Sequence, residues 1–319
     1  MLSNTKKVVV IGGGTGTYTV LSALKSRGFE LSAVVSMCDD GGSTGRLRDD
    51  YGVLPAGDIR RSLVALAADE TKARELFEYR FEDGDLAGHN FGNIFLAAAE
   101  KLSGNFYDAV KLAGTILNIE GNVFPVTLQD TRLFAELEDG SVVTGEKNID
   151  IPKHNPKLAI KRIFLKPKNP KANPDAINAI KNADVIIVGP GDLYTSILPN
   201  FLVGDISNSA RSSKAKKIYI CNLMTKYGET NNFLVQDFIN EIEKYIGKNI
   251  LDYILVNSKK PHKNRLGFYG KYNTRPVLAD DTFNHPNLHI ADLATNSGYI
   301  RHDKEKLAKT ILQILKHKS

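Results

Sequence analysis

The chain has 319 residues and a formal net charge of +6, and its 42% hydrophobic and 24% charged residues are ordinary proportions for a globular protein. No apolar run approaches the roughly 18 residues that a membrane helix needs, so we expect no membrane insertion. Two cysteines, Cys38 and Cys221, cannot form a disulfide framework and argue against a structural zinc site. Because the first residues also lack a signal-peptide core, we expect a cytoplasmic protein.

The positive charge is concentrated in two segments. Seven lysines and arginines fall between Lys153 and Lys171 with no acid among them, and six more lie between Arg301 and Lys318. No aromatic residues are interleaved in the manner of a single-strand nucleic-acid groove. We therefore interpret both segments as solvated surface and expect no nucleic-acid partner.

The first elements form a β-α-β unit. Residues 7–11 are a short apolar run that ends in glycine, residues 17–27 carry a helical apolar face, and residues 31–37 are a second apolar run. Their combined length of about 30 residues suits a parallel crossover. Four helices are predicted next, at residues 59–68, 73–79, 93–102 and 107–118.

The middle of the chain changes character before the α/β pattern returns. Residues 124–145 alternate around Asp139-Gly140, which predicts a β-hairpin with its outer strand at 141–144. A proline-punctuated basic loop follows. Beyond it, strands are predicted at 184–188, 217–220 and 253–256, and helices at 176–182, 197–209, 233–246 and 301–317.

This order predicts an α/β fold, a Rossmann-like, doubly wound and mostly parallel sheet with helices on both faces and an inserted β-hairpin. We expect one domain over residues 1–319, with the helical and hairpin insertion at about residues 58–165.

Two glycine-rich loops follow predicted strands. Glycines between a strand and a helix let backbone N–H groups approach an anion, and the helix dipole adds to the attraction. Neither the dinucleotide fingerprint nor the P-loop pattern fits the first loop. Both loops should face one crevice, because strand carboxyl ends share one edge of the sheet. The candidate phosphate-binding residues are Gly12, Gly13, Gly14, Thr15 and Gly16 in the first loop, and Gly189, Gly191, Asp192, Tyr194, Thr195 and Ser196 in the second.

A pair of acids ends the second strand. Asp39 and Asp40 can hold Mg²⁺ together with phosphate oxygens. A second glycine turn and an arginine follow them and can contact phosphate: Gly41, Gly42, Ser43 and Arg46. A solvated turn is the simpler alternative.

Isolated polar residues complete the candidate site. Asp58 is either a helix N-cap or a ligand contact, and His89 is either structural or an acid–base group. Asn93 opens a helix, and Asn222 and Thr225 follow a strand, so all three can reach the crevice.

These motifs resemble the CofD/YvcK family, and specifically its YvcK branch, the gluconeogenesis factors. The matching segments are residues 11–16, 39–48, 55–60, 88–93, 189–196 and 219–225. In the CofD branch the resemblance implies Mg²⁺-dependent transfer of a phospholactyl-type group from a nucleotide diphosphate. In the YvcK branch it implies a cytoplasmic protein that binds UDP-sugars such as UDP-N-acetylglucosamine and supports cell shape on gluconeogenic carbon sources. By position, Tyr269 (or Tyr272) and Arg301 resemble nucleotide-sugar contacts of that branch.

Three functions remain open. We favour a UDP-sugar-binding regulator without turnover. The alternative is a CofD-type transferase in which Asp39 and Asp40 hold Mg²⁺ and His89 assists proton transfer. The third is an NAD(P)-binding protein, which the incomplete fingerprint disfavours. Mg²⁺ and a nucleotide diphosphate (UDP-sugar, GDP or NAD(P)) are the expected ligands, and a homodimer or a cell-wall or regulatory protein partner is compatible with any of the three.

Overall fold

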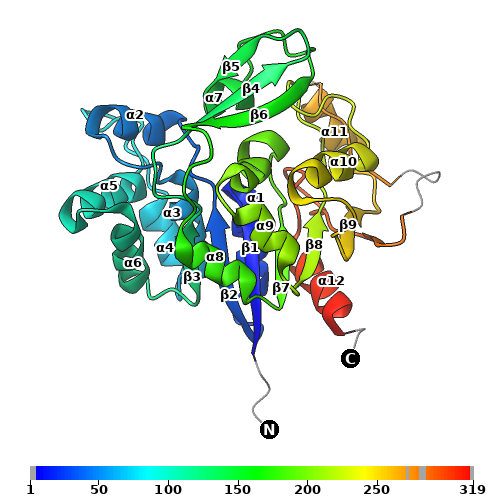
Figure 1. The fold of residues 1–319 in the computed structure, drawn as a ribbon, viewed down its shortest axis with the longest axis horizontal. Helices are drawn as coiled ribbons and strands as arrows, with labels where there is room; N and C mark the ends of the chain where they lie inside the picture. The colour runs from blue at the N-terminus through cyan, green and yellow to red at the C-terminus, as the bar shows by residue number, and fades with distance from the viewer. Residues whose placement is uncertain (1–4, 271–272, 280–284, 317–319) are drawn as a thin grey trace.

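The structure, a computed structural model, describes residues 5–270, 273–279 and 285–316. Its centre is a seven-stranded parallel sheet in the order β10-β9-β8-β7-β1-β2-β3, drawn in Figure 1. The strands are β1 (Lys6–Gly12), β2 (Phe29–Val35), β3 (Asn122–Pro125), β7 (Val185–Val188), β8 (Lys216–Ile220), β9 (Tyr253–Asn257) and β10 (Leu288–Ala291). Along the chain, β2 and β3 are added on one side of β1, and β7 to β10 are then added on its other side. The switch point of the topology therefore lies between β1 and β7, and the prediction of a doubly wound parallel sheet is confirmed.

Apolar runs form the central strands because both faces of the sheet are covered. Val8, Val9, Val10 and Ile11 of β1 are all at most 2% exposed. Val8 is in register with Leu31 of β2 on one side and with Val185 of β7 on the other. Such continuous burial, without alternation, is typical of a parallel strand between helical layers.

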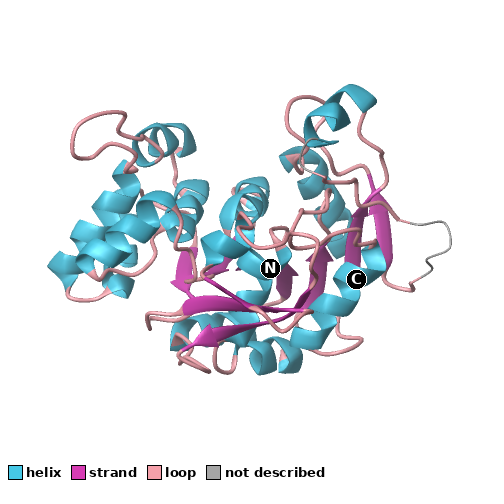
Figure 2. Ribbon diagram, turned by 90° about the horizontal axis from the view of Figure 1, so that it is seen from above, coloured by secondary structure: helices cyan, strands magenta, loops and turns pink. Residues whose placement is uncertain are grey.

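Helices cover both faces of the sheet (Figure 2). The helices outside the small antiparallel sheet region are α1 (Gly14–Leu24), α2 (Gly42–Tyr51), α3 (Gly57–Leu66), α4 (Glu70–Phe77), α5 (Phe91–Ser103), α6 (Phe106–Ile116), α8 (Pro174–Lys181), α9 (Ile206–Ser212), α10 (Val235–Ile246), α11 (Lys263–Gly270) and α12 (Lys304–Lys316). None of the helices in the described residues is both long and apolar enough to cross a bilayer.

The predicted helix at 197–209 is helical but interrupted. A π-helical turn at Leu193–Ile197 leads into a 3-10 turn at Leu198–Leu202, and α9 follows. Pro199 lies in the first turn of the 3-10 segment, where its missing N–H is tolerated, and the break before α9 includes Gly204, whose φ of 39° does not continue a helix. The side-chain amide of Asn200 donates to Ser196 O at 2.9 Å and to Gly12 O at 3.3 Å, which ties this turn to the end of β1.

The hairpin prediction is right in kind and wrong in extent. Phe124 belongs to β3, which pairs in parallel with β2 and divides the expected insertion. The hairpin is β4 (Arg132–Leu137) with β5 (Val142–Thr144), and a third strand, β6 (Ile160–Lys166), pairs with β4 inside the segment predicted as a basic loop. The lysines and the arginine of β6 are exposed, while Ile160, Ile163 and Leu165 are buried, so the basic residues obscure the apolar face of the strand in the sequence. This small antiparallel sheet lies at the top of Figure 1, and the short helix α7 (Glu146–Asp150) follows β5.

Candidate functional site

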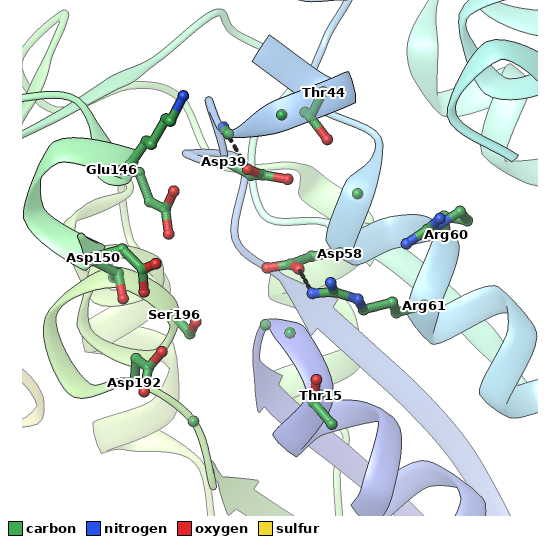
Figure 3. Close-up of a pocket in the computed structure, with 18 of the residues that line it drawn as sticks. Thr15, Asp39, Thr44, Asp58, Arg60, Arg61, Glu146, Asp150, Asp192 and Ser196 are labelled. Carbon is green, nitrogen blue, oxygen red and sulfur yellow. Dashed lines mark hydrogen bonds and ion pairs between the residues drawn. The ribbon is translucent and has the colours of Figure 1, made fainter. Parts of the chain in front are cut away.

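A cavity of about 440 Å³ lies at the switch point. It is enclosed by the loops after β1, β2 and β7, by the first turns of α1, α2 and α3, and by α7. We call it the switch-point cavity (Figure 3). The two glycine loops touch within it: a Cβ at Gly16 would overlap the carbonyl oxygen of Pro190. The predicted crevice shared by both loops is therefore present.

Helix α1 begins at the cavity. Its N-cap is Gly13, which makes no side-chain cap, and the N–H of Gly14 bonds to Asp58. Gly13 and Gly57 also allow close approach of carboxylates, because a Cβ at Gly13 would overlap Oδ2 of Asp58 and one at Gly57 would overlap Oδ2 of Asp39. Glycine is required at both positions to bring acids against the backbone.

Two carboxylates occupy the middle of the cavity. Asp39 accepts hydrogen bonds from the N–H of Gly41 at 2.9 Å and from the hydroxyl of Thr44. Asp58 accepts from the N–H of Gly14 and from Nη1 of Arg61 at 3.3 Å. The predicted N-cap role of Asp58 is wrong: α3 has Ala56 as its N-cap, and Asp58 lies in the first turn with its carboxylate in the cavity.

A second acidic wall comes from α7 and the β7 loop. Glu146, Asp150 and Asp192 line the side of the cavity opposite Arg60 and Arg61, as Figure 3 shows. One wall is thus acidic and the other is basic.

The negative charges of the acids in the cavity are poorly compensated by positive groups. Burial, and then the charge of Asp39, raise the pKa of Asp58 to about 6. Burial, and then the charges of Asp39 and Asp150, raise the pKa of Glu146 to about 9. Burial also raises the pKa of Asp39. Desolvation and like-charge repulsion act in the same direction, so both favour the protonated forms of these acids.

Among the described residues, three acids whose oxygens lie close together share an ion pair with one lysine. Oxygens of Asp150, Asp192 and Glu229 lie within 4.8 Å of one another. Nζ of Lys226 bonds to Asp150, lies 2.6 Å from Asp192 and is 3.2 Å from Glu229. Lys226 therefore joins α7 to the β7 loop at the edge of the cavity.

Most predicted site residues come together in this cavity. Those that line it are Gly13, Gly14, Thr15, Gly16, Asp39, Gly41, Gly42, Ser43, Asp58, Asn93, Gly191, Asp192, Thr195 and Ser196. Gly12, Asp40, Arg46, His89, Gly189, Tyr194, Asn222, Thr225, Tyr269 and Arg301 are not among the lining residues that the structure describes.

Asp40 and Arg46 contact other parts of the chain. Asp40 accepts from the backbone N–H of Lys147 at 2.8 Å and lies 4.0 Å from Arg132, so it secures the small antiparallel sheet. Arg46 is exposed and donates to Ala87 O at 2.9 Å.

His89 also lies away from the cavity. Its Nδ1 is 3.2 Å from Oγ of Ser43, and burial followed by the charge of Arg46 lowers its pKa. It lines a separate cavity with residues of α2 and α5. This position indicates that His89 supports the α2 turn.

Other predicted contacts support the loops. Tyr194 is buried at 1% exposure. Asn222 donates to Gly191 O at 2.7 Å, and Thr225 accepts from the N–H of Arg275 at 2.9 Å. Tyr269 accepts from the N–H of Ile300 at 2.9 Å. Tyr272 lies outside the described residues.

Several lining residues have no counterpart in the sequence-based prediction: Thr44, Arg60, Arg61, Arg80, Glu146, Lys147 and Asp150. Arg60 and Arg61 belong to α3 and Arg80 follows α4, two helices that the sequence predicted. The available signal was the pair of adjacent arginines that comes shortly after a glycine-aspartate pair at the start of α3. Glu146 and Asp150 come from the antiparallel sheet region, and local sequence does not indicate that they reach the cavity.

The description "2-phospho-L-lactate transferase CofD" belongs to a family model that matches residues 8–295. A protein described as "Gluconeogenesis factor" from Listeria innocua is 41% identical over 98% of this chain and 97% of its own, and one of the same description from Halalkalibacterium halodurans is 40% identical over 97% and 96%. A crystal structure of a UPF0052 family member from Bacillus halodurans superposes with a TM-score of 0.90 at 37% identity, covering 97% of this chain and 99% of that one. The chain therefore belongs to the CofD family, within its group of gluconeogenesis factors.

Proposed function

We propose that the switch-point cavity binds the diphosphate of a nucleotide-sugar, with UDP-N-acetylglucosamine as the favoured ligand, together with Mg²⁺. The observation that carries the proposal is the polarity of the cavity, in which Glu146, Asp150 and Asp192 lie opposite Arg60 and Arg61, with Asp39 and Asp58 between the two walls. A diphosphate bridged to a divalent cation matches that arrangement, because the cation meets the acids while the phosphates meet the arginines and the N-terminus of α1.

The donor set fits Mg²⁺. Carboxylate oxygens are its preferred ligands, and it usually keeps several waters while taking one or two carboxylates plus phosphate oxygens. Among the described acids, one group has its oxygens within 4.8 Å of one another, and Asp39, Asp58 and Glu146 do not belong to it. These three acids therefore suit a partly hydrated ion better than an ion held by protein ligands alone. Bound Mg²⁺ would neutralise the acids and the diphosphate together.

The phosphate side offers donors without partners. Thr195 Oγ1 is buried and has no hydrogen-bond partner among the described residues. Ser196 follows it within the turn Leu193–Ile197 and also lines the cavity. A phosphate oxygen would satisfy Thr195, and burying an unpaired hydroxyl otherwise costs about 1–3 kcal/mol.

Binding without turnover is supported by the position of His89, the histidine candidate for proton transfer, outside the cavity lining. The relatives' description as gluconeogenesis factors supports a role in growth on gluconeogenic carbon sources. We propose that the protein acts as a regulator in the cytoplasm and contributes to cell shape.

A CofD-type transferase is the second candidate. It is supported by the family match and by Asp58, whose pKa of about 6 suits a group that gains or loses a proton near neutral pH. In this alternative Asp58 and Arg61 would act at the transferred group, and Mg²⁺ would supply charge neutralisation.

Calorimetric titration with UDP-N-acetylglucosamine, with and without Mg²⁺, tests the proposal when the recovered ligand is weighed by mass spectrometry. Mg²⁺-enhanced binding with intact ligand supports the regulator. Conversion to a uridine phosphate supports the transferase, and absence of binding rejects both UDP-sugar assignments.

A further inference from the structure

Asn93 lines the switch-point cavity from the first turn of α5. Its side chain is buried, with the residue 4% exposed, and its backbone N–H bonds to Oδ1 of Asn90 at 3.3 Å. The residue before it is packed closely, since a Cβ at Gly92 would overlap Cδ of Arg60 and the carbonyl oxygen of Phe77. The backbone of Asn93 is therefore held in place by the protein itself.

A chain of hydrogen bonds sets which end of the Asn93 amide faces the ligand. Asp39 accepts the hydroxyl hydrogen of Thr44. Because a carboxylate can only accept, Thr44 is the donor in that bond, and the lone pairs of its Oγ1 remain for another donor. That donor is Nδ2 of Asn93, which lies 3.1 Å from Oγ1 of Thr44. The carbonyl oxygen Oδ1 of Asn93 is then the free end of the amide.

This free end has no partner in the protein. Oδ1 of Asn93 is buried and accepts no hydrogen bond from any group of the described residues. A buried acceptor without a donor is costly, so a ligand that supplies a donor gains affinity at this position. The phosphate oxygens of a nucleotide diphosphate are acceptors and cannot fill this role. Asn93 therefore complements a hydroxyl or an N–H group.

The lining of the cavity suits a sugar better than a nucleobase. Thr44 and Arg60 are the polar neighbours of the first turn of α5. Ile151 is the one apolar side chain among the described lining residues, and none of these residues is aromatic. Bases bind by stacking on aromatic side chains, whereas sugar hydroxyls are matched by polar groups such as these.

We propose that Oδ1 of Asn93 accepts a hydrogen bond from a donor on the sugar of the nucleotide-sugar, either a hydroxyl or an acetamido N–H group. The inference rests on the proposed function, because it places an uncharged sugar beside the diphosphate in the switch-point cavity. Asn93 is thereby the residue that distinguishes a nucleotide-sugar from the same nucleotide diphosphate without its sugar.

Calorimetry with UDP and with UDP-N-acetylglucosamine, in the same Mg²⁺ buffer, measures what the sugar adds to the affinity. In Asn93→Ala the ratio of the two affinities is expected to fall about 10-fold, the effect of one lost hydrogen bond, while UDP binding stays unchanged. Asn178→Ala, at an exposed position of α8, is the matched control and should keep the ratio.

Two results would overturn the assignment while leaving the proposed function standing. Equal weakening of both ligands in Asn93→Ala would place the contact on the nucleoside or on a metal-bound water, and an unchanged ratio with unchanged affinities would show that Asn93 contacts no ligand. Failure of UDP-N-acetylglucosamine to bind the wild-type protein would overturn the proposed function and the inference with it.

Ligand analogues that each lack one donor identify the group that Asn93 contacts. Fluorine replaces the hydroxyl at C3, C4 or C6 of the sugar, and an ester replaces the acetamide at C2. One of the four is expected to bind the wild-type protein about 10-fold more weakly and to lose nothing further in Asn93→Ala. The wild-type series tests the inference even if the variant does not fold, since four analogues that all bind as tightly as the parent ligand would overturn it. Losses that add fully to the effect of Asn93→Ala at every position would overturn it as well.

Discussion

Gly16 lies directly against Pro190, so the first turn of α1 and the loop after β7 share a surface that has no room for a side chain. A Cβ at Gly16 would fall on the Pro190 carbonyl oxygen and close to the N of Gly191. Both neighbours are backbone atoms, which cannot move aside as the end of a side chain can. Gly16 and Gly191 both line the switch-point cavity, so this contact forms part of its wall.

Gly16→Ala is therefore expected to reduce the free energy of unfolding by about 3 kcal/mol, the upper range for overpacking, and to weaken UDP-sugar binding. Chemical denaturation measures the first effect and calorimetry the second. Gly267→Ala is the matched control: in α11 its Cβ would meet nothing within 4 Å, so it should be neutral or slightly stabilising. Equal stability of Gly16→Ala and wild type would contradict the contact.

Asp58→Asn should stabilise the ligand-free protein at pH 8 by about 2 kcal/mol and abolish the Mg²⁺ dependence of binding. The folded pKa of about 6 lies above the usual value of 3.8 for an aspartate, so the penalty for the charge exists above pH 6 and disappears as the pH falls towards 4. Thermal unfolding and titrations with and without Mg²⁺ check both effects. Asp83→Asn, at an exposed position, should change neither. Retained Mg²⁺ dependence in Asp58→Asn would count against Asp58 as a cation contact.

Lys226→Met should destabilise the protein by about 3 kcal/mol, because it leaves Asp150, Asp192 and Glu229 without their shared cation. The side chain of Glu229 is 0% exposed, so of the three acids its charge is the most costly to leave without a cation. Adding Glu229→Gln to Lys226→Met should recover part of the loss. Denaturant unfolding of the single and double variants measures the coupling, and additive losses would show that the network is not coupled.

His302 should make the protein sensitive to acid. Burial lowers its pKa from 6.5 to about 4, and its Nε2 is buried without a partner in the described residues. Because the unfolded chain takes up the proton first, this group costs stability as the pH falls from 6.5 to 4, by up to about 3 kcal/mol. His302→Gln should remove that part of the pH dependence. Identical pH profiles of the free energy of unfolding for wild type and variant would disprove the role.

The sequence predicted the sheet because buried parallel strands read as apolar runs that end in glycine, as at Val8 to Gly12. It also placed both glycine loops at one crevice, since strand carboxyl ends share an edge. It missed β6, whose outward lysines hide an apolar face that includes Ile163 and Leu165.

The positions of the acidic side chains in the site could not be predicted from the sequence. Asp39 and Asp40 are neighbours in an extended stretch, so their side chains point in different directions and one of them faces the antiparallel sheet. Glu146 and Asp150 reach the cavity only because that sheet folds over the strand ends, a long-range contact that local patterns do not encode.

The most direct test of the proposed function is a crystal structure with UDP-N-acetylglucosamine and Mn²⁺ in place of Mg²⁺, with the ion located by its anomalous signal. We expect the ion beside Asp39 and Asp58 and the diphosphate between Gly13 and Arg61. An ion within the Asp150–Asp192–Glu229 cluster with Lys226 displaced, or a nucleotide outside the switch-point cavity, would contradict it.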